Sequence, residues 1–219
     1  MLFSNDKNQG IKSFSWLLAF TFLLIAVGMR AKWLINLDSM LQRITTIAGD
    51  SSMAKFFEFI TFFGSPMIVL LLSVVLIIYF LIKKESVTSL WIAFTILGGD
   101  ALAFIIKETV QRPRPSNIIG GDTGYSFPSG HVFGTMILVM LIVKIVVPRL
   151  KSYENIFLLK NISGLWLLIV IISRICLRSH YPSDAVGSIF LAIGWWNFSE
   201  VLYLRYYDLA SQVISKLKS

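Results

Sequence analysis

Cysteine is nearly absent from this sequence of 219 residues, since Cys176 is the only one. A single thiol excludes an intrachain disulfide and a metal site built from several cysteines, so we interpret Cys176 as a small apolar side chain. Charged residues are also scarce: they make up 15% of the chain, whereas soluble proteins have about a quarter. Hydrophobic residues reach 56%. This composition excludes an ordinary water-soluble domain and indicates a membrane protein.

Acidic residues are outnumbered by basic ones, which leaves a net charge of +8. Such an excess could indicate nucleic-acid binding, but proteins of that class gather their basic residues on one face or stripe. Here most of them stand in short segments between apolar runs, where positive charge orients a membrane protein. We therefore expect membrane lipids around this chain, no nucleic-acid partner and no obligate protein partner.

Six apolar runs approach the roughly 20 residues that a helix needs to cross a bilayer. The longest, at residues 59–82, has 24 residues without a charge. The others lie at about residues 13–29, 86–106, 132–147, 162–177 and 185–204. The first run lacks the small-residue cleavage site of a signal peptide, so we expect it to remain as a span. The sequence thus predicts an all-α fold, a bundle of six transmembrane helices in one membrane-embedded domain over residues 1–219.

The distribution of positive charge predicts the orientation of the six spans. Both termini lie on one side, together with ten lysines and arginines: Lys7, Lys12, Lys83, Lys84, Arg149, Lys151, Lys160, Arg205, Lys216 and Lys218. Apart from residues near the histidines, the other side has four: Arg30, Lys32, Arg43 and Lys55. Because cytoplasmic loops are enriched in lysine and arginine, we expect a cell-membrane protein with cytoplasmic termini and its two histidines towards the outer face.

Two features of the apolar pattern leave alternatives open. Residues 30–58 mix apolar and polar side chains, which suits either an amphipathic segment along the outer interface or a loop packed on the bundle. Asp100 lies inside the third run, and an acid within a membrane is costly unless it has a partner or a function. We expect it either to pair with a polar group on a neighbouring helix or to belong to a functional site.

Three polar segments interrupt the apolar pattern, all at ends of spans on the same predicted side: residues 107–115, 127–131 and 173–184. Their cations include Lys107, Arg114 and Arg174. Guanidinium forks and lysine ammonium groups are the usual protein ligands of phosphate. These three side chains could therefore converge on a small anion.

The second polar segment adds a different means of binding an anion. Ser129 is predicted to cap the N-terminus of the fourth span, where free backbone N–H groups and the helix dipole favour negative charge. Gly130 lets the backbone approach a ligand closely. The sequence thus predicts an anion site that three separate segments assemble.

Both histidines of the chain fall in these segments. Pro182 suits the first turn of the sixth span, which would bring Asp184 back to His180. A carboxylate bonded to one ring nitrogen fixes the tautomer and leaves the other nitrogen free to attack. His131 comes from another span and could act across the anion as a general acid. A metal fits this site less well, because the nearby cations would repel it and can themselves neutralise phosphate charge.

At these residues the sequence resembles the type-2 phosphatidic acid phosphatase superfamily, whose three-part signature is K-x6-R-P, P-S-G-H and S-R-x5-H-x3-D. All three parts match in order and spacing, at residues 107–115, 128–131 and 173–184. By this resemblance His180 is the nucleophile that forms a phosphohistidine, Asp184 orients it, and His131 protonates the leaving oxygen and later activates water. The residues that would hold the phosphoryl oxygens are Lys107, Arg114, Ser129, Gly130 and Arg174.

The resemblance also implies an activity: hydrolysis, without metal or cofactor, of a phosphate from a membrane lipid in the outer leaflet. Small bacterial members of the superfamily act on phosphatidylglycerol phosphate, phosphatidate or undecaprenyl diphosphate, and the motifs leave the choice among these open. Two alternatives are a phosphotransferase that passes the phosphoryl group to an alcohol and a non-enzymatic lipid transporter or scaffold. Arg112 and Arg178 lie beside the signature but outside it, so their roles stay open.

Overall fold

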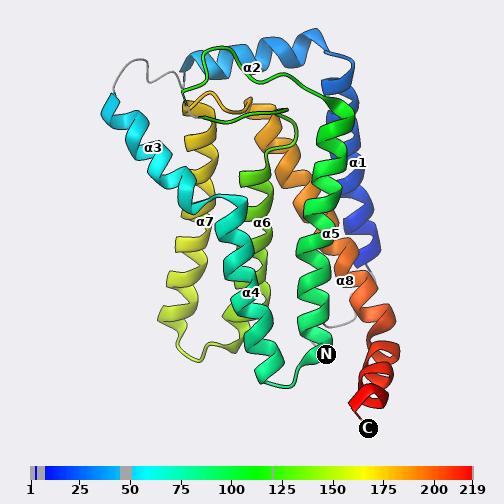
Figure 1. Cartoon of the computed structure of the whole chain (residues 1–219). Coiled ribbons are helices and arrows are strands. Elements are labelled where there is room, and N and C mark those ends of the chain that lie inside the picture. The colour runs from blue at the N-terminus through cyan, green and yellow to red at the C-terminus, as the bar shows by residue number, and fades with distance from the viewer. Residues whose placement is uncertain (1–2, 4–7, 45–50, 120, 219) are drawn as a thin grey trace.

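The computed structural model describes residue 3 and residues 8–44, 51–119 and 121–218. Lys7, one of the ten cations on the side of the termini, and residues 45–50 of the mixed segment lie outside the described residues. The described chain is all-α, as predicted (Figure 1). Its helices are α1 (Gln9–Gly28), α2 (Lys32–Ile44), α3 (Ser51–Phe63), α4 (Pro66–Ile82), α5 (Ser86–Val110), α6 (Gly130–Leu141) with a π-helical turn (Ile142–Val146) and a 3₁₀ turn (Val147–Arg149), α7 (Tyr153–Cys176) and α8 (Pro182–Lys218).

Six helical segments of the described chain are long and apolar enough to cross a membrane, which confirms the predicted number. They are Gln9–Gly28, Ser52–Ile82, Ser86–Val110, Gly130–Arg149, Tyr153–Cys176 and Pro182–Lys216. Most of these helices extend beyond the predicted apolar runs, because a helix can continue through polar residues that lie outside the apolar core of a bilayer. The largest extension is at the end of α8, which the sequence placed near residue 204 and which reaches Lys218.

The second span consists of two helices, whereas the apolar run at residues 59–82 predicted one unbroken helix. The chain breaks between α3 and α4 at Gly64 and Ser65. Pro66 follows as the first residue of α4, where its missing N–H costs nothing, and the Ser65 hydroxyl caps the first turn. A Cβ at Gly64 would lie 2.8 Å from the Val170 side chain of α7. Glycine at the break therefore allows close packing against α7.

α2 lies across the end of the bundle rather than along it (Figure 1). Leu34 and Asp38, one turn apart, are buried, whereas Trp33, Leu37 and Met40 are exposed. One face of α2 is therefore packed on the bundle and another presents apolar side chains to the surroundings. For residues 32–44 the structure agrees with the hypothesis of an amphipathic segment.

α8 lies at the centre of the packing, since it contacts α1, α2, α5 and α6. Leu191, Ala192 and Trp196 of α8 are fully buried. Large apolar side chains on the other helices are exposed instead, as Phe22 on α1 and Ile78 on α4 illustrate. This pattern suits a bundle in lipid, where the outer surface is as apolar as the core. The N-terminal end of α8 meets α2, so the junction between α7 and α8 lies at the covered end of the bundle.

Asp100, the acid within the third span, is exposed on α5. No hydrogen bond or ion pair joins it to any residue that the structure describes. The expectation that Asp100 pairs with a polar group on a neighbouring helix is therefore wrong, because the side chain lies on the surface of the bundle rather than between helices.

Candidate active site

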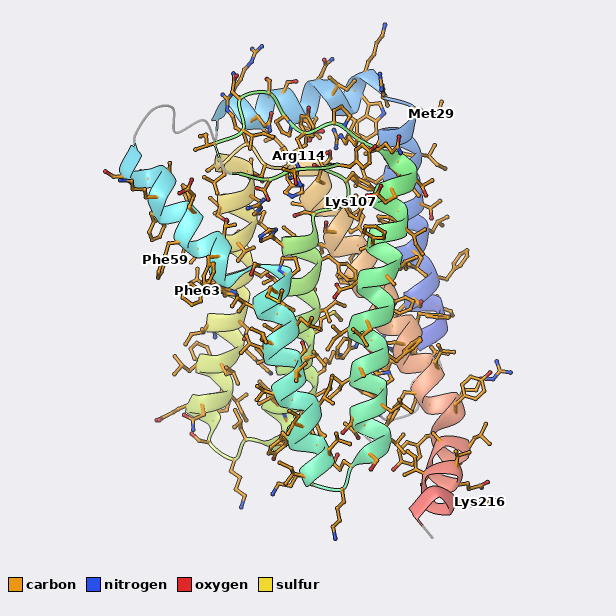
Figure 2. The ribbon with its side chains drawn as sticks, viewed as in Figure 1. Met29, Phe59, Phe63, Lys107, Arg114 and Lys216 are labelled. Atoms are coloured by element: carbon orange, nitrogen blue, oxygen red, sulfur yellow. The ribbon has the colours of Figure 1, made fainter. Side chains whose placement is uncertain are left out.

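The three polar segments meet at the end of the bundle that α2 covers. The loop after α5 crosses this end, and the Ile119 N–H donates to the Leu177 carbonyl at 3.0 Å. Figure 2 shows Lys107, in the last turn of α5, and Arg114, in the loop, at this end of the molecule. Segments that are distant in the sequence thus face one another, as their common predicted side of the membrane suggested.

His180 is held in one tautomer by this loop. Its Nδ1 lies 2.7 Å from the carbonyl oxygen of Ser126. A carbonyl oxygen only accepts hydrogen bonds, so Nδ1 carries the ring proton and Nε2 keeps its lone pair. The Asp184 carboxylate does reach back to Nδ1, but at 3.5 Å it is farther than a normal hydrogen bond. The sequence assigned the orienting role to Asp184 and missed Ser126, because a backbone carbonyl gives no side-chain signal.

The imidazole of His180 is neutral at physiological pH. The residue is 1% exposed. The pKa of His180 is lowered to about 4. Burial is the main cause, the neighbouring Asp184 acts in the opposite direction, and the charges of Arg174 and Arg114 add to the lowering. A neutral imidazole with its proton on Nδ1 needs no deprotonation before Nε2 can attack an electrophile.

Arg114 links the loop to the junction between α7 and α8. Its guanidinium donates to the carbonyls of Thr123 at 3.0 Å, Gly124 at 3.1 Å and Ser179 at 2.7 Å. The Nη1 that donates to Ser179 also lies 3.3 Å from Nε2 of His180. Arg114 therefore places a well-fixed positive charge beside the nitrogen that would attack.

Arg174 is a buried cation with unused hydrogen-bonding capacity. Its Nη2 donates to Asp122 Oδ2 at 2.5 Å, whereas its Nε has no partner among the residues that the structure describes. The Ser129 hydroxyl, just before α6, is likewise buried and unpaired within the described chain. Buried polar groups are normally hydrogen-bonded. These two groups therefore indicate a place for a ligand.

Asp122, in the loop between α5 and α6, forms an ion pair with Arg174 where a bound anion would otherwise lie. Its carboxylate accepts hydrogen bonds from Arg174 at 2.5 Å and from the Ser179 hydroxyl at 2.6 Å. Burial alone would raise the pKa of Asp122, but the Arg174 guanidinium and the hydrogen bond from Ser179 hold it well below its usual range. Asp122 stays ionised and stands where a bound anion would compete for Arg174. Sequence reasoning missed this residue because it lies between the motifs.

His131 faces the same region from the first turn of α6. Together with Asp122 and Arg174 it lines a cavity of about 220 Å³, whose other walls are Glu58, Thr61, Phe62, Ser65, Gly121 and Leu177. His131 is also an electrostatic neighbour of His180 and Lys107. His131 in α6 and His180 at the junction between α7 and α8 thus lie at the same end of the bundle. Their roles as acid and nucleophile stay a prediction.

The predicted anion-binding residues gather at this end of the bundle. Lys107 interacts electrostatically with Arg114 and Arg174. Gly130 begins α6 and Ser129 precedes it, as predicted, although the Ser129 hydroxyl forms no capping hydrogen bond. Three cations that interact with one another at one end of the bundle, one of them lining the cavity, suit an anion. The expectation that the chemistry needs no metal or cofactor stays a prediction.

The two arginines beside the motifs differ in their surroundings. Arg112 forms ion pairs with Asp38 at 2.7 Å and with Asp184 at 2.5 Å. It is therefore a partner of Asp184 and Asp38 rather than an additional ligand for an anion. Arg178 has a left-handed backbone, with φ of 55°, at the junction between α7 and α8. Asp38 was not expected from the sequence, although it is the only acid in α2.

Several known proteins share parts of this sequence or its fold. Residues 88–207 match the PAP2 superfamily. Phosphatidylglycerophosphatase B of Haemophilus influenzae is 32% identical over 83 residues, which cover 37% of this chain and only 33% of that protein. The crystal structure of a transmembrane PAP2 type phosphatidylglycerolphosphate phosphatase from Bacillus subtilis has a TM-score of 0.74 at 19% identity, covering 89% of this chain and 96% of that one. LpxE of Aquifex aeolicus has a TM-score of 0.54 at 21% identity, covering 78% and 96%.

Proposed function

Because this chain belongs to the PAP2 superfamily, we propose that it is a membrane phosphatase that removes phosphate from a lipid, with His180 as nucleophile. The observation that carries the proposal is a neutral imidazole whose Nε2 lies 3.3 Å from the Arg114 guanidinium. Arg174 and Ser129 add buried polar groups that lack partners within the described chain. A small oxygen-rich anion such as phosphate is the ligand that these groups suit best.

In the first step, Nε2 of His180 attacks phosphorus, and an N–P bond forms while the bond from phosphorus to the lipid oxygen breaks. His131 donates a proton to that oxygen, so the lipid leaves as an alcohol or, from a diphosphate, as a monophosphate. The ring of His180 becomes positively charged in this step. The Ser126 carbonyl and the Asp184 carboxylate face its Nδ1–H and stabilise that charge.

In the second step, water attacks phosphorus of the phosphohistidine. His131, now neutral, accepts a proton from the water, the N–P bond breaks, and inorganic phosphate leaves. The lone pair returns to Nε2 of His180, and both histidines regain their starting states. The net reaction converts a lipid phosphate and water into the free lipid alcohol and phosphate.

The cations stabilise the charge that develops on the three equatorial oxygens of phosphorus. Lys107, Arg114 and Arg174 supply positive charge from three different segments. Backbone N–H groups in the first turn of α6, beginning at Gly130, add the positive end of a helix dipole. A substrate phosphate has to replace the Asp122 carboxylate as the partner of Arg174. Arg174 then binds the substrate instead of an acid of the same chain.

We further propose that the site faces the outer leaflet and that both termini are cytoplasmic, as the positive-inside rule predicts. Asn117, exposed in the loop after α5, and Lys151, exposed between the fourth and fifth spans, lie on opposite predicted sides. We expect Asn117→Cys to react with a membrane-impermeant thiol reagent in intact cells, and Lys151→Cys to react only after permeabilisation. Both are made in a Cys176→Ser background. The reverse pattern would move the chemistry to the cytoplasm.

The phosphate-binding residues recognise the phosphate and do not select the lipid that carries it. The names of the Haemophilus and Bacillus relatives favour phosphatidylglycerol phosphate, with phosphatidate and undecaprenyl diphosphate as competitors. Phosphate release by purified protein, measured for these three lipids in excess EDTA, tests the proposal. We expect release from at least one of them. No release from any would overturn the proposed function, and transfer to an added alcohol would favour the phosphotransferase.

A further inference from the structure

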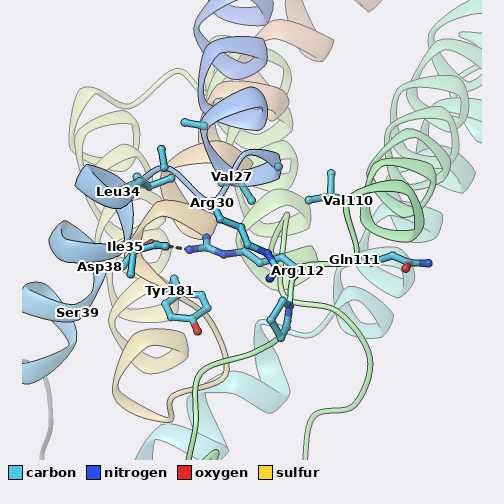
Figure 3. A pocket seen from close by; sticks show the side chains of 14 residues that line it. Val27, Arg30, Leu34, Ile35, Asp38, Ser39, Val110, Gln111, Arg112 and Tyr181 are labelled. Carbon is cyan, nitrogen blue, oxygen red and sulfur yellow. Dashed lines mark hydrogen bonds and ion pairs between the residues drawn. The ribbon is translucent and has the colours of Figure 1, made fainter.

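A buried acid on α2 connects this crossing helix to the catalytic end. Asp38 is 1% exposed. The Ser183 N–H donates to Asp38 Oδ1 at 2.9 Å, and the Ser183 hydroxyl donates to Oδ2 at 2.6 Å. Nη2 of Arg112 also donates to Oδ2, at 2.7 Å (Figure 3). Both oxygens of Asp38 are therefore held by groups from the start of α8 and from the loop after α5.

The second terminal nitrogen of Arg112, Nη1, binds Asp184. Nη1 donates to Asp184 Oδ1 at 2.5 Å and to the Ser183 hydroxyl at 2.7 Å. The guanidinium also stacks on Tyr181, with 4.1 Å to the centre of the ring. Burial alone would lower the pKa of Arg112, yet Asp184 and Asp38 raise it. The arginine is thus a permanently charged bridge between two carboxylates.

The backbone of Arg112 reaches the other group that faces His180. Its carbonyl accepts a hydrogen bond from the Ser126 N–H at 2.9 Å, and the Ser126 carbonyl lies 2.7 Å from His180 Nδ1. Asp184 Oδ2 is 3.5 Å from the same nitrogen. Both groups near Nδ1 are therefore bonded to Arg112, one through its backbone and one through its side chain.

Asp38 limits how Arg112 can pair with Asp184. An arginine that is free to do so often binds both oxygens of one carboxylate with its fork. Here Nη2 is taken by Asp38, so Asp184 receives only Nη1 on Oδ1. Its Oδ2 remains available to the Tyr181 N–H, at 2.9 Å, and to the imidazole. Without Asp38, the fork of Arg112 can take both oxygens and draw Asp184 away from His180.

We propose, on the basis of the proposed function, that Asp38 is a positioning residue of the reaction: it holds Arg112 so that Asp184 and Ser126 keep His180 aligned for attack. The hydrogen bonds of Asp38 go to Ser183 and Arg112 rather than to His180. Asp38 belongs to a helix that carries none of the motif residues. α2 thereby becomes part of the machinery that orients the nucleophile.

Asp38→Asn keeps the size of the side chain and removes the charge that holds Arg112. In purified full-length protein we expect kcat to fall about 10- to 100-fold, by analogy with residues that orient metal-ligating side chains through a hydrogen bond. KM should stay within about twofold, because the cations that bind phosphate are unchanged. The loss should be equal for a lipid phosphate and an aryl phosphate, since His180 attacks both. An unchanged kcat overturns the proposal.

Leu34→Ala is the matched control for anchoring of α2. Leu34 is buried one turn before Asp38 on the same face of the helix and belongs to the apolar core. If Asp38 only anchors α2, both variants should lower the Tm and kcat alike. If Asp38 positions Arg112, Leu34→Ala should lower the Tm and keep kcat, whereas Asp38→Asn should lose kcat. Ser39→Ala, an exposed neighbour, should change neither quantity.

A double-mutant cycle tests whether Asp38 acts through Arg112. Adding Asp38→Asn to Arg112→Gln should change kcat by less than about twofold, because the connection is already broken. Losses that multiply would overturn the proposal. Arg112→Lys gives a second route if Asp38→Asn does not fold: it keeps the charge and lacks the fork, so a similar loss of kcat is expected. Full activity in Arg112→Lys would contradict the bridging role.

Anion binding separates this proposal from the proposed function. Vanadate imitates five-coordinate phosphorus and needs an aligned Nε2, whereas inorganic phosphate needs only the cations. Asp38→Asn should weaken vanadate binding about tenfold and phosphate binding less than about twofold, as measured by calorimetry. This split can be observed even if no lipid is hydrolysed, in which case the proposed function fails and the positioning role stands. Equal weakening of both anions, or of neither, contradicts the positioning role.

Discussion

The two ends of the helix bundle differ in how they satisfy buried polar groups. At the end away from α2, Nε2 of Gln9 donates to Asn197 Oδ1 at 2.7 Å and to Glu200 Oε2 at 2.5 Å. At the end that α2 covers, the Nε of Arg174 and the hydroxyl of Ser129 have no partner in the described chain. Among the described residues, the buried polar groups around Gln9 are paired, whereas those two at the end that α2 covers are not.

This difference distinguishes stabilising contacts from a binding site. A fully paired polar cluster joins α1 to α8 and favours one arrangement of the two helices. An unpaired buried group costs free energy until a ligand satisfies it. The third such group among the described residues, the Thr135 hydroxyl, lies one turn beyond His131 on α6. Unsatisfied groups thus gather where the chemistry is proposed, and the following experiments test that contrast.

Removal of the nucleophile has the largest expected effect. His180→Ala should lower kcat by at least about 10⁴-fold, because no other described group offers a lone pair in this position. It should also abolish the covalent phosphoenzyme, which rapid quenching with labelled phosphate detects. The Tm serves as the control for folding. Labelled phosphoenzyme in this variant would assign the attack to another residue.

The loss in His131→Ala should depend on the leaving group. A lipid phosphate, whose alkoxide needs a proton, should react about 10²–10⁴-fold more slowly. An aryl phosphate needs little protonation and should still phosphorylate His180. Hydrolysis of the intermediate also requires His131, so an acid-labile phosphoenzyme should accumulate. Equal losses for both substrates, without accumulation, would exclude His131 as the acid.

A pair of substitutions compares the two ends directly. Arg174→Gln should lower kcat/KM about 10²–10³-fold, since it removes a donor aimed at the developing charge. Gln9→Ala should leave kcat/KM unchanged and lower the free energy of unfolding by about 1–3 kcal/mol, since buried acceptors lose their donor. Enzyme kinetics and chemical denaturation of both variants provide the test. Lost activity in Gln9→Ala would remove the distinction between the ends.

The neutral state of His180 predicts its pH dependence. With a pKa of about 4, the imidazole should show no protonation between pH 7 and about pH 5 in an NMR titration. In the unfolded chain the same imidazole takes up its proton near pH 6.5. Below that pH, protonation therefore stabilises the unfolded state more than the folded state. The folded protein should therefore lose stability between about pH 6.5 and pH 4. A titration midpoint near 6.5 would mean that His180 is solvated.

The smallest effect is expected for the acid that occupies the anion position. Asp122→Asn should lower KM for a lipid phosphate about threefold, because a competing internal anion no longer holds Arg174. Inhibition by inorganic phosphate should become stronger by the same factor, with kcat little changed. Asp208→Asn, in the long C-terminal part of α8, is the control for loss of a negative charge. A raised KM would assign Asp122 to substrate binding instead.

The parts of the site that follow from local spacing were predictable. His180 and Asp184 are four residues apart across a proline, and the start of α8 at Pro182 brings them within 3.5 Å. Ser129 precedes α6 for the same local reason, since its position before a long apolar run marks a helix start. Spans follow from apolar length alone.

The missed features depend on contacts between distant segments. Ser126, Asp122 and Asp38 are single polar residues outside the motifs, and each acquires its role from a segment that folding brings within 3 Å. The break before Pro66 had a local signal in the proline, but the uniform apolar run concealed it. Asp100 shows the converse case, because its exposure depends on how α5 is rotated in the bundle.

The sequence by itself determined the membrane class, the six spans and the presence of three polar segments at the ends of spans on one side. These depend on composition and on spacing within or at the end of one helix. Only the tertiary structure decided that a backbone carbonyl fixes the His180 tautomer, that Asp122 occupies the anion position, and that α2 is joined to Asp184 through Arg112. These contacts depend on how separate segments of the chain are placed in space. Hydropathy and motif spacing describe single segments, so they do not predict such placement.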